Sequence, residues 1–88
     1  MEDRDVQRTE ARSNFQTFLA DLPRLLTDNQ GRYAVYRRQH LVEVFESFSA
    51  AVAYGNMRYK DRLFSVQEIT DEPLELGGLP YAADSGDV

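Results

Sequence analysis

Apolar residues return at helical spacing in the first third of the chain. Between positions 15 and 26 they recur every three or four residues, which predicts an amphipathic helix. Ser13 is a suitable N-cap and Gly31 a suitable stop, so we expect the helix between them. Pro23 lies inside the pattern, where it either kinks the helix or begins a second short one capped by Asp21. The stripe consists of Phe15, Phe18, Leu19, Leu22, Leu25 and Leu26, and the opposite face of Asn14, Gln16, Thr17 and Asp21.

After Arg32 the pattern changes to an alternation with a period of about two, which is typical of β-strands. Residues 33–36 and 41–46 alternate in this way and predict a hairpin. The polar break 37–40 contains neither Gly nor Asn-Gly, so we expect a four-residue loop rather than a tight two-residue turn. A third apolar run, 63–69, predicts the last strand, and Asp71-Glu72-Pro73 ends it.

A second, shorter helix is expected between the hairpin and the last strand. Ser47 can cap it, Phe48 begins it, and Gly55-Asn56 is expected to end it near Tyr54. The element order is therefore α-β-β-α-β. A right-handed crossover that returns the third strand beside the first gives an antiparallel sheet of strand order 2-1-3. With both helices on one face of this sheet, the predicted fold is a small two-layer α+β sandwich.

The two ends of the chain differ from its middle. Residues 1–12 alternate acids and bases and are expected to form a flexible lead-in to a single domain over 13–70. Residues 71–88 are expected to form a flexible acidic tail, because they carry five acidic residues and no Lys or Arg. Residues 1–70 carry ten of each sign. A neutral body with an acidic tail argues against general affinity for polyanions.

Length and composition exclude several classes of protein. The 88 residues of the chain are too few for an enzyme with separate cofactor and substrate domains. The chain has no cysteine, which excludes disulfides, thiolate zinc sites and a thiol nucleophile. No apolar run approaches the ~20 residues of a membrane span, and the charged N-terminus is unlike a signal peptide. We therefore expect a soluble cytoplasmic protein without a membrane contact.

Residue types that carry chemistry do not converge in this sequence. His40 is the single histidine and has no evident metal-binding or acid–base partner. Strand alternation places Glu43 and Glu46 on opposite faces, which separates them as a catalytic pair. Gly77-Gly78 precedes Leu79-Pro80 rather than a helix, so it forms no phosphate-binding loop. We predict no enzymatic activity, no metal and no cofactor.

Two surfaces are candidates for binding. The leading interpretation is a protein–protein interaction module with an unknown protein partner, in which apolar residues of the acidic tail add to a partner's sheet edge or dock in a groove. These tail residues are Leu74, Leu76, Leu79 and Tyr81. Alternatively, Leu74 and Leu76 fold back over the open sheet face, or the tail is inert. A homodimer is a further possibility, because a domain of about 60 residues has a marginal core.

The alternative is a module that binds single-stranded RNA. Phosphate contacts from arginine and stacking on tyrosine would supply the affinity. The residues that would do this are Arg37, Arg38, Arg58, Arg62, Tyr36 and Tyr59. The acidic net charge favours the protein partner.

Three segments together resemble a family of small bacterial α+β domains of unknown function. They are the leucine-rich run 18–26, the Gly31-x-Tyr33-x-Val35 strand and the final strand 63–66. The likeness covers residues 15–73 and implies a small fold that transfers no catalytic residue. Two features depart from the family pattern: Arg37-Arg38-Gln39-His40 replaces a turn with glycine or aspartate, and the acidic extension after Pro73 is longer.

Overall fold

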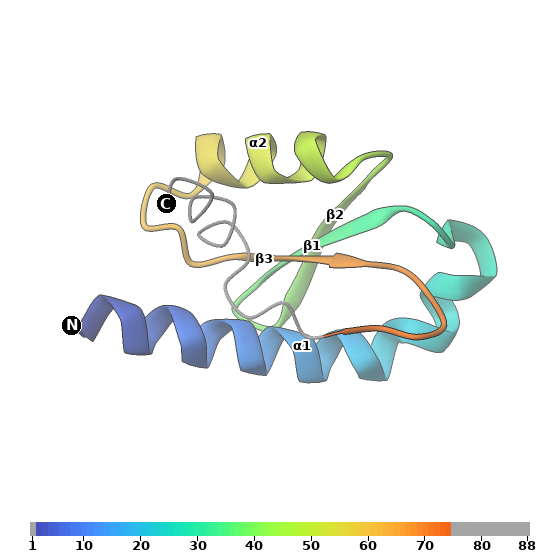
Figure 1. Cartoon of the computed structure of the whole chain (residues 1–88), viewed down its shortest axis with the longest axis horizontal. Helices are drawn as coiled ribbons and strands as arrows, with labels where there is room; N and C mark the ends of the chain where they lie inside the picture. Colours follow the sequence, from blue (N-terminus) through green and yellow to red (C-terminus); the bar gives the residue numbers. More distant parts are fainter. Residues whose placement is uncertain (1, 75–88) are drawn as a thin grey trace.

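A computed structural model describes residues 2–74 of the chain, and the side chains of residues 5–74. The predicted α+β class and the α-β-β-α-β order are confirmed (Figure 1). The elements are α1 (Glu2–Asn29), β1 (Tyr33–Arg37), β2 (His40–Phe45), α2 (Phe48–Arg58) and β3 (Ser65–Glu68).

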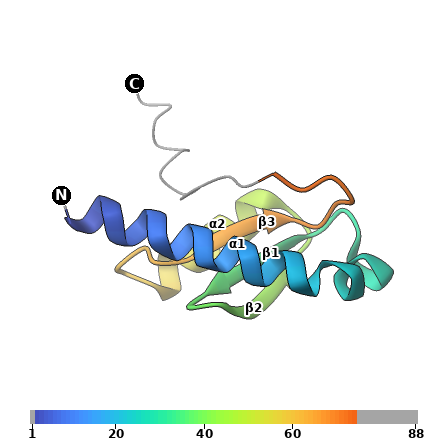
Figure 2. The ribbon, with the colours of Figure 1, turned by 90° about the horizontal axis from the view of Figure 1, so that it is seen from below.

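The three strands form one antiparallel sheet in the order β2-β1-β3, as the crossover argument predicts. β1 is the central strand, and its residues 34–36 are fully buried. Helix α1 runs across all three strands (Figure 2). β2 and β3 are therefore the two edges of the sheet.

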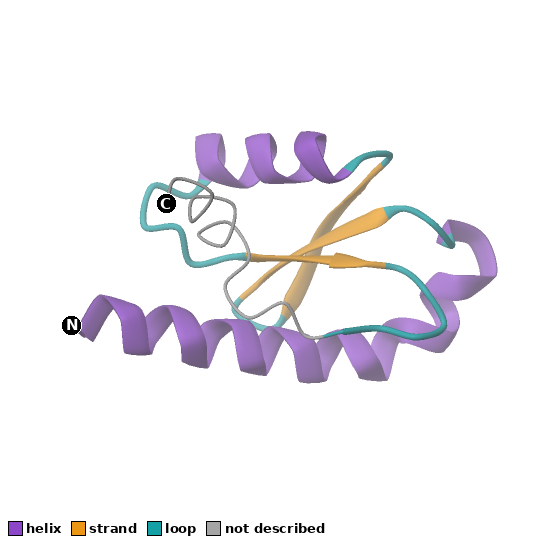
Figure 3. Cartoon of the chain, in the orientation of Figure 1, coloured by secondary structure: helices purple, strands orange, loops and turns teal. Residues whose placement is uncertain are grey.

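The two helices cover opposite faces of the sheet, so the expected two-layer arrangement is wrong (Figure 3). Ala34 and Tyr36 of β1 pack with Phe18, Leu22 and Leu25 of α1. On the other face, Val35 packs with Ala51 of α2 and with Phe64 and Val66. The reason is that β1 carries apolar side chains on both faces, and each face needs its own cover to exclude water.

Helix α1 is longer than predicted. It begins at Glu2, so residues 2–12 are helical rather than an irregular lead-in, and Ser13 lies inside the helix instead of capping it. Ala11 in this early part is buried, which gives the segment a packing contact that its charged pattern concealed. Pro23 is exposed and does not split the helix in two. Gly31, at φ +89°, follows the helix end as predicted, because glycine adopts this conformation without strain.

The hairpin turn contains two residues, Arg38 and Gln39, and the expected four-residue loop is wrong. Both residues have positive φ, 53° and 66°, which is the geometry of a tight hairpin turn that normally contains Asn or Gly. Side chains of α1 hold this turn conformation by accepting hydrogen bonds from its backbone N–H groups. The Arg38 N–H donates to the Glu10 carboxylate (2.6 Å), and the Gln39 N–H donates to Asn14 Oδ1 (2.7 Å).

Helix α2 begins as predicted but ends later. Ser47 caps it, its side-chain oxygen accepting from the Ala50 N–H at 3.1 Å. The helix continues through Gly55 to Arg58, so the predicted stop at Gly55-Asn56 is wrong. Gly55 serves packing instead, because the Phe64 ring lies where a Cβ at this position would stand. Glycine is therefore required here by a close approach and not by a helix end.

Candidate interaction surfaces

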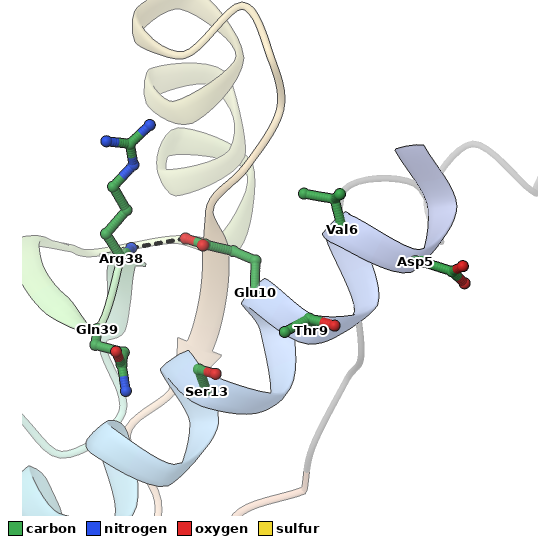
Figure 4. Close-up of a pocket in the computed structure, with 7 residues that line it drawn as sticks. All are labelled: Asp5, Val6, Thr9, Glu10, Ser13, Arg38 and Gln39. Atoms are coloured by element: carbon green, nitrogen blue, oxygen red, sulfur yellow. Dashed lines mark hydrogen bonds between the residues drawn. The ribbon is translucent and has the colours of Figure 1, made fainter. Parts of the chain in front are cut away.

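A hollow of about 440 Å³ opens between the N-terminal turns of α1 and the hairpin turn. Figure 4 shows its walls, with the Arg38 guanidinium pointing away from Glu10. Its lining combines hydroxyl groups, carboxylates and one guanidinium, without a histidine among the described residues. The lining residues are Asp5, Val6, Thr9, Glu10, Ser13, Arg38 and Gln39.

Asn14 is a buried polar residue that the helical pattern assigned to the outer face. It is fully buried, and its Nδ2 lies within hydrogen-bond distance of the Tyr36 carbonyl (3.2 Å) and of Ser65 Oγ (3.1 Å). Its Oδ1 accepts from the turn at Gln39. One side chain therefore joins α1, β1, β3 and the hairpin turn. The sequence signal was present only as a polar residue beside the apolar stripe.

Tyr36 is fully buried, so it is not available for the base stacking that the RNA interpretation assigned to it. Its hydroxyl donates to Asp21 Oδ2 at 2.6 Å. Burial, followed by the hydrogen bond to Asp21, raises the pKa of Tyr36 well above its usual value. Asp21, which the pattern also assigned to the outer face of the helix, is thus turned toward the sheet.

Arg37 is held by the loop that precedes β3. Its guanidinium contacts both Asp61 oxygens, at 2.8 and 3.1 Å, and donates to the Leu63 carbonyl at 3.1 Å. It also lies 4.4 Å from the centre of the Tyr59 ring, in a cation–π contact. The hydrogen bond from Arg37, together with one from the Leu63 N–H, lowers the pKa of Asp61 to about 2. The Arg37 guanidinium is therefore engaged by contacts within the fold.

The other predicted RNA-binding residues lie around this contact. Arg38, beside Arg37 in the hairpin turn, is exposed, and Arg58 is exposed at the end of α2. Arg62 is also exposed, next to Asp61 in the same loop. Tyr59 is half-buried beneath Arg37. The structure thus brings most of this set to one end of the sheet but withdraws Tyr36.

Only the first of the predicted tail residues lies in the described part. Leu74 is 72% exposed, and its carbonyl accepts from Gln67 Nε2 at 3.1 Å. The segment that follows β3 therefore returns alongside this strand. Leu76, Leu79 and Tyr81 lie outside the described residues.

The two edges of the sheet differ in their cover. Three of the four β3 residues, Ser65, Val66 and Gln67, are buried. In β2, by contrast, no residue is buried, and His40, Leu41 and Glu43 are exposed. In Figure 2, β2 lies along one margin of the described chain, whereas the segment after β3 runs beside the opposite margin. We call the outer side of residues 40–45 the β2 edge.

The remaining candidates for chemistry stay apart. His40 is exposed at the start of β2, and Glu46 pairs with Arg32 at 3.1 Å. Within residues 2–74, no three metal-binding side chains gather to hold an ion. Neither described helix has the length and apolarity to cross a membrane.

Comparison with known proteins gave no further assignment. No family model, no curated protein and no solved structure matches the chain. The resemblance to small bacterial domains stays a prediction.

Proposed function

We propose that the protein is a small non-enzymatic interaction module that binds a protein partner by accepting a β-strand on the β2 edge. The single observation that carries this proposal is the difference between the two edges, because β3 is buried while β2 is open. An open edge presents backbone donors and acceptors that an extended segment can pair with.

Exposed apolar side chains beside the edge support the same proposal. Leu41 is 38% exposed on β2, and Leu19 is 41% exposed on α1. Strand addition combines backbone hydrogen bonds with such side-chain contacts, which supply specificity. The tail could contribute further contacts through Leu74. We also propose a cytoplasmic location, supported by the absence of cysteine.

Capture from a native lysate tests the proposal. The tagged chain is compared with Leu41→Lys, which places a charge on the β2 edge, and with Met57→Lys, a matched change at a 69% exposed residue of α2. After nuclease treatment, we expect a stoichiometric protein partner with the wild type and with Met57→Lys, and its loss with Leu41→Lys. Equal capture by all three proteins would contradict the use of this edge. A chain ending at Leu74 then measures the contribution of the tail.

A second candidate function is binding of single-stranded RNA. The observation that favours it is the gathering of exposed Arg38, Arg58 and Arg62 at the end of the sheet where Arg37 stacks on Tyr59. Binding of a labelled oligonucleotide is expected to weaken with salt along a log–log line, with a slope of about 0.7 per contacted phosphate. Absence of binding at low salt would end this alternative.

A further inference from the structure

We propose that the strand that pairs with the β2 edge belongs to a second copy of this chain, so that two sheets join antiparallel into one. This inference rests on the proposed function and names the partner. It follows from three properties of β2: the faces on which its side chains lie, the distribution of its charges and the apolar surface beside it.

The side-chain pattern of β2 is symmetric about its middle. Leu41 lies opposite Tyr36 and Val44 opposite Ala34, so both face α1, whereas Glu43 lies opposite Val35 and faces α2. The register shift between Val35 and Tyr36 makes Val42 an extra residue, and the two residues of such a bulge project to the same face.

This symmetry allows β2 to pair with itself. When Leu41 of one copy stands opposite Val44 of the other, Val42 stands opposite Glu43 and every pair shares one face of the joined sheet. In a two-fold interface of this kind, each contact occurs twice, once from each copy. A shift by one residue would place side chains from opposite faces against each other, whereas this register keeps Leu41 and Val44 together on the α1 face.

The charges of β2 and its flanks also favour antiparallel self-pairing. Exposed Arg38 and His40 stand at the beginning of the strand and exposed Glu46 stands just beyond its end, whereas exposed Glu43 lies near its middle. Antiparallel pairing brings the beginning of one strand against the end of the other, so Arg38 approaches Glu46 of the second copy, which already pairs with Arg32 of its own chain at an exposed site. Opposite charges therefore meet at both ends of the interface, whereas parallel pairing would place like charges together.

Apolar surface of α1 extends the contact. Asn14 marks the β3 side of α1, because its amide contacts Ser65. Phe18 and Leu22 face the sheet. At about 100° of rotation per residue, Leu19 and Asn14 lie on opposite sides of this sheet-facing pair. Leu19 is therefore on the β2 side, above the same face as Leu41. Pairing of two edges would cover both exposed side chains in each copy.

The mass of the purified full chain in solution is the first measurement. We expect twice the 10.1 kDa of one chain in light scattering, with dissociation on dilution. Leu41→Lys is expected to raise the dimer dissociation constant at least 10-fold, whereas Met57→Lys leaves it unchanged. Circular dichroism melting curves of both variants establish that each is folded.

A charge exchange tests the antiparallel direction. Arg38→Glu and Glu46→Arg are each expected to raise the dissociation constant about 5-fold, because each breaks two symmetry-related exposed ion pairs, and melting curves measure the loss of the intrachain Arg32 pair in Glu46→Arg. The double variant restores both pairs and is expected to recover most of the affinity. A double variant that is weaker than either single variant would overturn the antiparallel arrangement.

Cysteine cross-linking tests the register. Because the chain has no native cysteine, only the introduced residues can form disulfides. Oxidation of a mixture of Leu41→Cys and Val44→Cys chains is expected to give mainly the mixed disulfide, since opposite residues in an antiparallel pair have Cα atoms about 5.5 Å apart. Each variant alone is expected to cross-link much less. Equal cross-linking of the separate variants would overturn the register.

A wild-type chain that stays monomeric at every concentration, or a dimer that Leu41→Lys leaves intact, would overturn the second-copy proposal. Its failure is distinguishable from failure of the proposed function. A monomer that captures a different protein in a manner that Leu41→Lys abolishes keeps the β2 edge as a binding site and assigns it another partner. Binding lost on nuclease treatment would instead assign the surface to RNA.

Discussion

The two edges of the sheet show how one small chain can be closed on one side and open on the other. β3 is held from several directions: by Asn14 of α1, by Phe64 packed on α2, and by the returning segment at Leu74. β2 is held mainly by its pairing with β1, and its outer side is exposed. The difference teaches that the packing that stabilises the sheet is concentrated at the β3 edge, while the β2 edge stays open for the proposed binding, so substitutions at the two should have different consequences.

The largest expected effect separates the two edges directly. Phe64→Ala removes a fully buried ring next to β3 and is expected to lower the free energy of unfolding by about 3–5 kcal/mol. At concentrations where the chain is monomeric, Leu41→Ala at the β2 edge is expected to cost less than about 1 kcal/mol, because the side chain already contacts water. Urea unfolding of both variants measures the difference. Equal losses would show that β2 is as closely packed as β3.

Asn14→Ala comes next, because it removes a side chain that joins β3, β1 and the hairpin turn. The buried groups left without a partner predict a loss of about 2–3 kcal/mol. Gln16→Ala, an exposed neighbour on the same helix, is the matched control and is expected to change little. Chemical denaturation compares them. A small loss for Asn14→Ala would mean that water replaces the side chain at no cost.

Tyr36→Phe sharpens the comparison at the central strand between the two edges. It keeps the ring and removes the hydrogen bond to Asp21, so we expect a loss of about 1.5 kcal/mol. The raised pKa of Tyr36 means that the folded chain holds this proton more tightly than the unfolded chain. The contribution is therefore complete below the ordinary tyrosine value of 10 and is lost as pH rises above it. Unfolding at pH 8 and pH 11 should show a larger alkaline loss for the wild type than for Tyr36→Phe.

The smallest expected effect concerns the loop that leads into β3. The pKa of Asp61 is about 2 in the folded chain, below its ordinary value of 3.8, so its contribution is present above pH 4 and is lost as pH falls toward 2. Its side chain is 44% exposed, so solvent screening limits the effect to at most about 1 kcal/mol. Thermal melts between pH 2 and 5 should show a steeper acid loss for the wild type than for Asp61→Asn. Parallel curves would contradict a role for the Arg37 contact.

Features that depend on neighbours in the sequence were predictable. Ser47 caps α2 and Gly31 follows the end of α1, because capping and chain reversal are settled within a few residues. The strand order followed from a rule about crossovers, which needs only the order of elements.

Features that depend on contacts between residues far apart in the sequence could not be predicted. Gly55 appeared to end a helix, but it is kept small by Phe64, a residue of the loop before β3. The two-layer prediction failed for a similar reason. The residues of β1 are apolar on both faces of the strand, but the sequence does not say which helix covers each face. At the candidate site, the pattern could suggest apolar and basic residues, but the openness of the β2 edge and the burial of Tyr36 exist only once the chain is folded.

The hairpin turn has a consequence for the order of folding. Arg38 and Gln39 adopt a conformation that their own residue types disfavour, and the groups that hold it lie 28 and 25 positions earlier in the chain. The β1–β2 hairpin, ordinarily a local unit that forms early, is therefore expected to lock only when α1 docks. This makes a short-range element kinetically dependent on long-range contacts, which slows folding and makes it more cooperative.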